Sequence, residues 1–100
     1  MTSEEKLKKL GWKQGELINN RLFFSIGVCV LFVHQADDKI GIFINEEMIY
    51  HEPTDKQLKL FTKGAKILQQ MDEHPDDFTI RQKDDVQTAL RCLIEIIKKN

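Results

Sequence analysis

The sequence predicts a small two-layer α+β domain, in which helices pack on a three- to four-stranded antiparallel meander. Residues 22–33 form a twelve-residue apolar run rich in Phe, Ile and Val, which suit a pleated, half-buried surface. Short apolar segments separated by turn-forming residues follow this run, and the second half of the chain repeats apolar residues at helical spacing. We therefore expect the order α-β-β-β-α-(β)-α in a single domain over residues 1–100.

The run over residues 22–33 is predicted to be one long core strand. It is too short for a membrane helix, which needs ~20 apolar residues, and a signal peptide would place its apolar region nearer the start. Because side chains alternate along a strand, one face is bulky, whereas the centre of the other holds Ser25, Gly27 and Cys29. We expect a helix of the same chain, or a bulge at Gly27, to explain these small residues. A partner chain packed on them is the alternative.

A short helix is predicted ahead of this strand. Thr2 is a candidate N-cap, and acidic residues follow it, which favours a helix N-terminus. Gly11 is a plausible helix stop. Trp12, directly after it, is expected to dock the helix on the core, and residues 15–20 are expected to form a loop.

Two further strands are expected after the apolar run. Residues 36–39 resemble a turn between antiparallel strands, and Ile40, Ile42 and Ile44 alternate over the next segment. A second turn at residues 46–47 would then lead into a strand over residues 48–51. Together these segments form a meander with a long first strand.

Two helices are predicted in the second half of the chain. Thr54 and Gln57 match a capping box, and a wide apolar stripe follows them up to Met71. Acidic residues and Pro75 end this helix. Residues 78–80 are expected to form a short edge strand or an anchored loop, and the last helix is predicted over residues 84–99.

Composition excludes several functional classes. The 15 basic and 16 acidic residues give a net charge of −1 without a dominant positive cluster, which argues against non-specific nucleic-acid binding. Cys29 and Cys92 lie in apolar surroundings, so we expect reduced thiols in the cytoplasm. No membrane segment and no glycine-rich phosphate loop is recognisable, and no cofactor is expected.

The histidines are the first candidates for a chemical site, since each lies close to carboxylates in the sequence. A metal-dependent or hydrolytic enzyme would use His34 and His51 with Asp37 and Asp38, provided that the strand ends converge. None of these residues has the spacing of an established ligand motif. A pair of Cys29 with His34 is excluded, because residues five apart on a strand point to opposite faces.

The function predicted by elimination is a small cytoplasmic protein-binding or regulatory domain without catalysis of its own. One candidate surface is the face of Ser25, Gly27 and Cys29, or a free strand edge, through which two copies could associate. The other is Trp12 together with the nearby lysines Lys9 and Lys13, although burial of Trp12 in the core is the simpler interpretation. Nucleic-acid binding through the N-terminal lysines is the weakest alternative.

Overall fold

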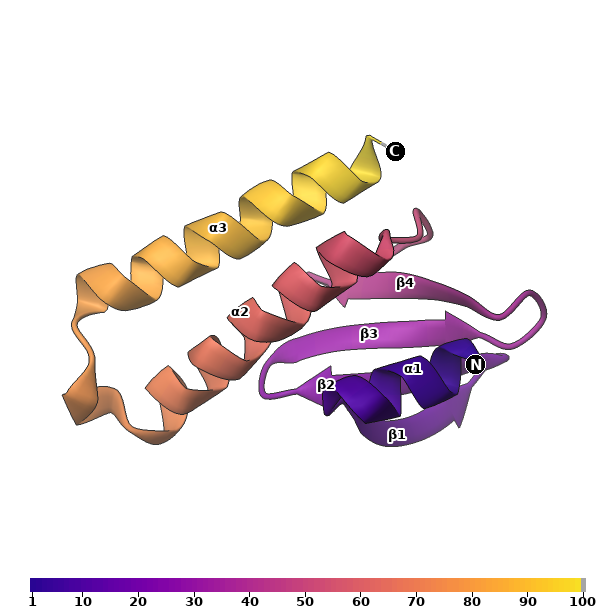
Figure 1. Ribbon diagram of the computed structural model, residues 1–100, viewed down its shortest axis with the longest axis horizontal. Helices are drawn as coiled ribbons and strands as arrows, with labels where there is room; N and C mark the ends of the chain where they lie inside the picture. The colour runs from indigo at the N-terminus through magenta and orange to yellow at the C-terminus, as the bar shows by residue number, and fades with distance from the viewer. Residues whose placement is uncertain (100) are drawn as a thin grey trace.

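The computed structural model describes residues 1–99 and confirms the α+β class (Figure 1). Asn100, the last residue of the predicted domain, lies outside the described residues. One five-stranded antiparallel sheet, in the order β1-β2-β3-β4-β5, replaces the expected three- to four-stranded meander. The elements are α1 (Ser3–Leu10), β1 (Lys13–Ile18), β2 (Arg21–Ile26), β3 (Cys29–His34), β4 (Lys39–Ile44), β5 (Glu47–Ile49), α2 (Asp55–Glu73), the 3-10 turn η1 (Pro75–Asp77) and α3 (Ile80–Lys98).

The prediction of one long strand over residues 22–33 is wrong, because a two-residue turn divides the run into β2 and β3. Ile26 pairs with Cys29, which leaves Gly27 and Val28 as the loop. Gly27 has a φ of 58°, the left-handed conformation that a hairpin turn of type II′ requires at its first central residue. The turn also reverses the alternation of the side chains. Residues of β2 and β3 that a single strand would place on one face therefore lie on opposite faces of the sheet.

Residues 15–20 form strand and turn, not the expected loop. Gly15 to Ile18 belong to β1, and Asn19 and Asn20 make a two-residue turn in which both residues have positive φ. Asparagine adopts this conformation more readily than most residues, which favours a type I′ hairpin. Pairing between β1 and β2 shifts by one residue between Gln14 and Leu17, where β1 carries a bulge.

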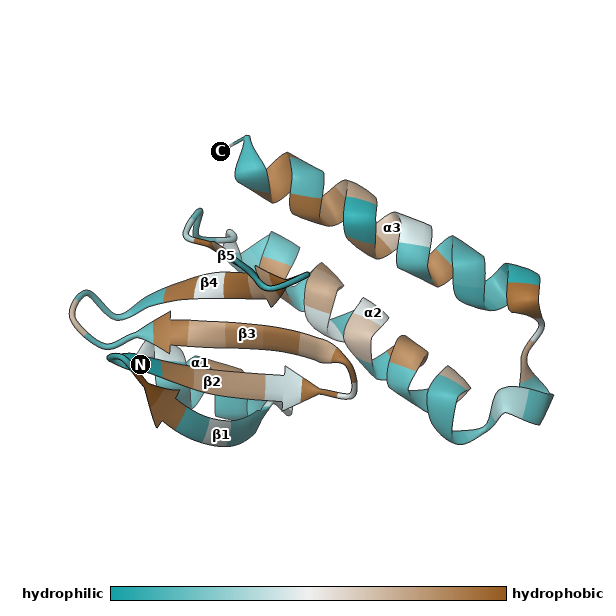
Figure 2. Ribbon diagram, turned by 180° about the vertical axis from the view of Figure 1, so that it is seen from behind, coloured by the Kyte–Doolittle hydropathy of each residue, from teal (hydrophilic) through white to brown (hydrophobic). Residues whose placement is uncertain are grey.

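All helices lie on the same side of the sheet. In Figures 1 and 2, α1 and α2 cover one face of the strands, while α3 packs on α2 rather than on the sheet. The covered face carries the cross-strand row Phe24, Leu31, Ile42 and Ile49, each at most 3% exposed. This row packs with Leu58, Phe61, Ala65 and Leu68 of α2 in the main core.

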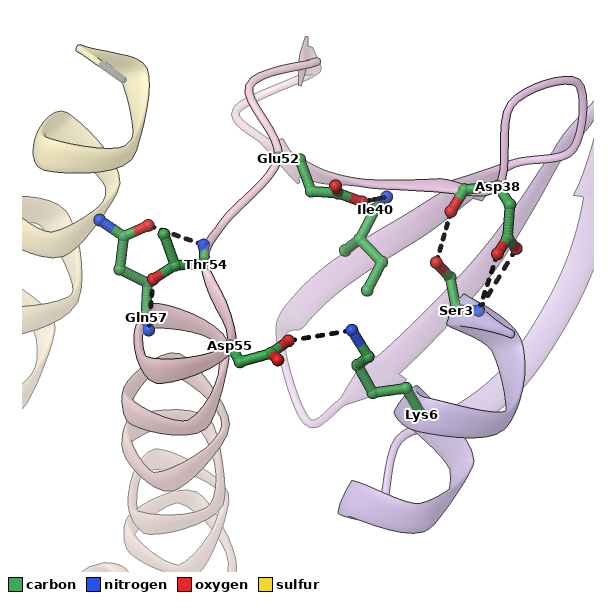
Figure 3. Close-up of polar contacts among 8 residues, drawn as sticks. All are labelled: Ser3, Lys6, Asp38, Ile40, Glu52, Thr54, Asp55 and Gln57. Atoms are coloured by element: carbon green, nitrogen blue, oxygen red, sulfur yellow. Dashed lines mark hydrogen bonds and ion pairs between the residues drawn. The ribbon is translucent and has the colours of Figure 1, made fainter. Parts of the chain in front are cut away.

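Both long helices begin with a complete capping box. The predicted pair Thr54 and Gln57 is confirmed: the Gln57 amide N–H donates to the Thr54 hydroxyl at 3.2 Å, and the Thr54 amide donates back to the Gln57 side chain (Figure 3). Thr79 and Gln82 form the same arrangement at the start of α3. Residues 78–80 are therefore not a strand, and α3 begins four residues before the predicted start.

Polar contacts fix α1 to the rest of the domain (Figure 3). The Ser3 amide donates to the Asp38 carboxylate at 3.1 Å, and the Ser3 hydroxyl donates to the Asp38 carbonyl oxygen. Lys6 pairs with Asp55 at 2.9 Å, and this hydrogen bond lowers the pKa of the Asp55 carboxyl. Gly11 ends α1 at a φ of 104°, as predicted. A search of residues 1–99 found no helix with the length and apolarity that crossing a membrane requires.

Candidate functional site

The side of the sheet opposite the helices has no helix over it, and we call this side the open face. Directly paired residues of antiparallel strands point to the same side, so the strand pairing defines which residues belong to it. The open face is formed by Ile18, Arg21, His34 and Lys39 in one row, Phe23, Phe32 and Gly41 in the next, and Lys13, Ser25, Val30, Phe43 and Met48 in the third. Figure 2 views the sheet from this side.

Aromatic rings occupy the centre of the open face. Phe23 lies 5.7 Å from Phe43 and 6.0 Å from Phe32 between ring centroids, and Tyr50 contacts the Phe32 ring edge to face at 5.4 Å. These geometries are those that aromatic pairs prefer. Phe32 is fully covered, whereas Tyr50 remains 52% exposed. The cluster is therefore a small apolar core in which Tyr50 contributes the most accessible ring.

Gly41 makes room for this cluster. A Cβ atom at this position would lie 2.3 Å from Cζ of Phe32 and 2.7 Å from the Ile49 carbonyl oxygen. Both distances are too short for a carbon side chain, so only glycine lets the Phe32 ring and the end of β5 lie over β4 here.

Cationic groups border the aromatic cluster. The Arg21 guanidinium lies 5.5 Å from the Tyr50 ring centroid, within the range of a cation–π contact. Its Nη1 donates to the Asn19 carbonyl at 3.2 Å, while its buried Nε lacks a hydrogen-bond partner among residues 1–99. Lys13 and Lys39 are exposed at the two margins. The paired rows of this face include no carboxylate, and its charged side chains are mainly cationic. Glu16 lies in the bulge of β1 opposite Phe23, and Asp37 contacts His34 at the margin.

His34 lies at the margin of the open face and contacts Asp37. Its Nδ1 is 3.1 Å from the Asp37 carboxylate, and the Lys39 amide donates to the same oxygen at 3.3 Å. Desolvation acts to raise the pKa of the Asp37 carboxyl, but the contacts with His34 and Lys39 together hold this pKa below its ordinary value. The pair thus orders the turn between β3 and β4.

The residues predicted as an interaction surface do not share one face. Ser25 and Lys13 are direct cross-strand partners on the open face, whereas Gly27 lies in the turn after β2. Cys29 points to the helix side, where it packs against the main core. The prediction that Ser25, Gly27 and Cys29 form one small-residue face is therefore wrong, because the turn places these residues in three different environments.

Trp12 lies in the core rather than on a binding surface. It is 3% exposed, stacks on Phe61 with 6.0 Å between ring centroids, and donates from Nε1 to the Thr62 hydroxyl at 2.9 Å. The indole therefore anchors α1, and Lys9 remains as an exposed side chain of that helix.

The four residues of the metal hypothesis do not form a site. His34 contacts Asp37, but the Asp38 side chain is engaged by the Ser3 amide. Within residues 1–99, no group of three or more His, Cys, Asp or Glu side chains has an arrangement that could hold a metal ion.

A cleft of about 770 Å³ lies between α3 and the sheet and includes Cys29 in its wall. Its other lining residues include apolar side chains of the core, such as Ile42 and Ile94, and charged ones, such as Arg91 and Glu95. Burial, reinforced by the Asp72 carboxylate, raises the pKa of the Cys29 thiol. Such a thiol is a poor nucleophile at neutral pH, since the thiolate is the reactive form.

Cys29 is expected to react with iodoacetamide several times more slowly than the exposed Cys92. Burial limits access to Cys29, and its raised pKa leaves less thiolate at a given pH. Mass spectrometry of protein quenched at intervals measures both rates, and denatured protein, in which the two rates should converge, is the control. A native Cys29 as fast as Cys92 would contradict the described burial.

Comparisons of the chain with protein-family models, with curated proteins and with solved structures found no match. Sequence reasoning missed the aromatic cluster, because assigning residues 22–33 to one strand placed Phe32 with Phe24 on a single face. Gly27 was the signal in the sequence that could have indicated a turn. A turn there puts Phe32 opposite Phe23 and separates it from Phe24.

Proposed function

We propose that this chain is a small cytoplasmic interaction domain that uses the open face of its sheet to bind a protein partner, and that it has no catalysis of its own. The observation that carries this proposal is the aromatic and mainly basic surface that no helix of residues 1–99 covers. Aromatic residues and arginine are enriched at the centres of protein interfaces. Two free cysteines agree with a reducing compartment.

The chemistry of the open face favours a partner segment with apolar anchor residues and at least one carboxylate. Tyr50 offers an accessible ring, and its hydroxyl lies 3.3 Å from the Met48 sulfur. Met48 and Val30 are partly exposed apolar side chains of the same face. Arg21 carries a positive charge beside the exposed Tyr50 ring. An acidic side chain of the partner would complement this cation and the flanking lysines.

A protein fits the open face better than a single-stranded nucleic acid does. Bases bind by stacking on exposed ring faces, but Phe32 is fully covered and Phe23 packs against its neighbours. The net charge of −1 also supplies little general attraction for phosphates.

The β1 edge of the sheet is a poorer candidate than the open face. β1 is exposed along its whole length, but its bulge and the charged residues Lys13 and Glu16 oppose strand addition. The side chains of the open face do not oppose the binding of a partner in this way.

Selection of displayed random peptides on the purified protein tests the proposal. We expect enriched peptides that combine aromatic or aliphatic residues with Asp or Glu. Tyr50→Ser should weaken their binding by about 2 kcal/mol, the loss typical of an interface hot spot, since it removes the exposed ring and its contact with Arg21.

Ile80→Ser is the matched control, because Ile80 is 83% exposed at the start of α3, away from the sheet. Binding that both variants retain would place the site elsewhere. Enrichment of no peptide, together with tight binding of single-stranded RNA or DNA, would contradict the proposal.

A further inference from the structure

The helical hairpin of α2 and α3 carries a second apolar surface, separate from the open face. A groove of about 300 Å³ runs between the two helices, lined by Leu60, Lys63, Gly64 and Ile67 of α2 and by Val86, Ala89, Leu90 and Leu93 of α3. Seven of these eight residues lack a charge. We refer to this surface as the hairpin groove.

The hairpin groove faces away from the sheet. Helical periodicity puts Leu60 and Ile67 on the side of α2 opposite Leu58 and Ala65, which are buried in the main core. Leu60 is 50% exposed, and Ile96 continues the apolar surface on α3 at 54% exposure. A helix that is apolar on two sides is normally covered on both, so the groove is an unsatisfied packing surface.

Small residues at the middle of the two helices let α2 and α3 approach each other closely along the groove. Gly64 lies near the middle of α2, where a Cβ atom would be 2.6 Å from Cδ2 of Leu90. Ala89 lies at the middle of α3. The groove is therefore centred on the hairpin, halfway between its two ends.

The two ends of the hairpin carry opposite net charges. The connected end, residues 72–85, carries six acidic and two basic residues, a net charge of −4. The other end, residues 55–63 with 91–99, carries six basic and two acidic residues, a net charge of +4. The hairpin is thus self-complementary about its midpoint.

We infer that the occupant of the hairpin groove is a second copy of this chain, related by a two-fold axis through the groove. This axis would place the acidic end of each hairpin against the basic end of its partner and would form an antiparallel four-helix bundle. Each helix has 19 residues, or ~28 Å. Two such helices side by side cover ~560 Å² per chain, which is close to the lower limit for a specific dimer.

Sedimentation equilibrium of the full chain tests this inference. We expect twice the monomer mass of 11.7 kDa. Leu60→Glu should return the mass to that of the monomer, because it places a carboxylate at the exposed apolar surface. Leu17→Glu makes the same change at a residue of β1 that is 61% exposed, and it should leave the dimer intact. Circular dichroism verifies that both variants are folded.

Charge exchange tests the antiparallel geometry. A variant with Lys56→Glu and Lys63→Glu lowers the net charge of the basic end from +4 to 0. A variant with Asp84→Lys and Asp85→Lys raises the net charge of the acidic end from −4 to 0. Each alone should dimerise at least tenfold more weakly than the wild type, and an equimolar mixture should recover the heterodimer. A wild type that stays monomeric at millimolar concentration would overturn the inference, as would a dimer insensitive to Leu60→Glu or a mixture without recovery.

Discussion

Trp12→Ala is expected to lower the free energy of unfolding by about 3–5 kcal/mol, the range for deleting a large buried aromatic side chain. The indole fills the space between α1 and α2, stacks on Phe61, and donates a hydrogen bond to Thr62. Its loss also weakens the docking of α1, which has eight residues and is too short to be stable alone. Urea denaturation followed by far-ultraviolet circular dichroism measures the change.

Trp12→Phe separates the ring from its hydrogen bond. Phenylalanine keeps an aromatic contact with Phe61 and removes the Nε1 donor, whereas the Thr62 hydroxyl retains its bond to the Leu58 carbonyl oxygen at 2.7 Å. We expect this variant to lose less than the alanine variant, since a single hydrogen bond contributes about 1 kcal/mol. Equal losses in the two variants would show that Trp12 does not act through packing.

Gly41→Ala is expected to destabilise the domain by about 1–3 kcal/mol, the usual cost of overpacking. The added methyl group would lie 2.3 Å from the Phe32 ring and 2.7 Å from the backbone oxygen of Ile49. Because one of these neighbours is backbone, a rotamer change of Phe32 cannot relieve the whole clash. The same denaturation experiment measures the loss.

Gly15→Ala is the control for this prediction. It adds the same methyl group to another strand glycine, where the nearest atom is the Phe23 carbonyl oxygen at 3.4 Å, an ordinary contact. Its effect should be small or slightly stabilising, since alanine reduces the entropy of the unfolded chain. A Gly41→Ala variant as stable as Gly15→Ala would contradict the packing described around Phe32.

The helical part of the fold could be predicted largely from local signals. Thr2, Gly11 and the capping box of Thr54 act within a few residues of where they stand, so they place the ends of helices without knowledge of tertiary contacts. The start of α3 carries the same signal at Thr79 and Gln82, but the acidic residues at 84–85 suggested a later start. A consistent search for capping boxes would have located it.

The strands were harder to predict, because apolar continuity conceals a tight turn. Ile26 and Cys29 are both apolar, and the loop between them consists only of Gly27 and Val28, so no polar residue marks the turn. β1 presents the opposite problem: all six residues are exposed, and no alternation distinguishes them from a loop. Its place in the sheet depends on pairing with β2, which is a tertiary property.

The same errors explain why the candidate site was predicted only in part. Ser25 and Lys13 were predicted as interaction residues and are neighbours on the open face, but the residues that dominate this face, such as Phe32 and Tyr50, were not selected. Their convergence depends on register across three hairpins, and a one-residue change in register would move each side chain to the other face.

Site-specific photo-crosslinking in the source cells tests the claim of an open-face interaction most directly. A benzoylphenylalanine replacing Tyr50 should form a discrete adduct with another protein, of a mass that is not a multiple of 11.7 kDa. The same probe at Ile80, which is 83% exposed and lies on α3, should not form that adduct. An adduct with another protein from Ile80, but none from Tyr50, would contradict the assignment of the open face as the binding surface.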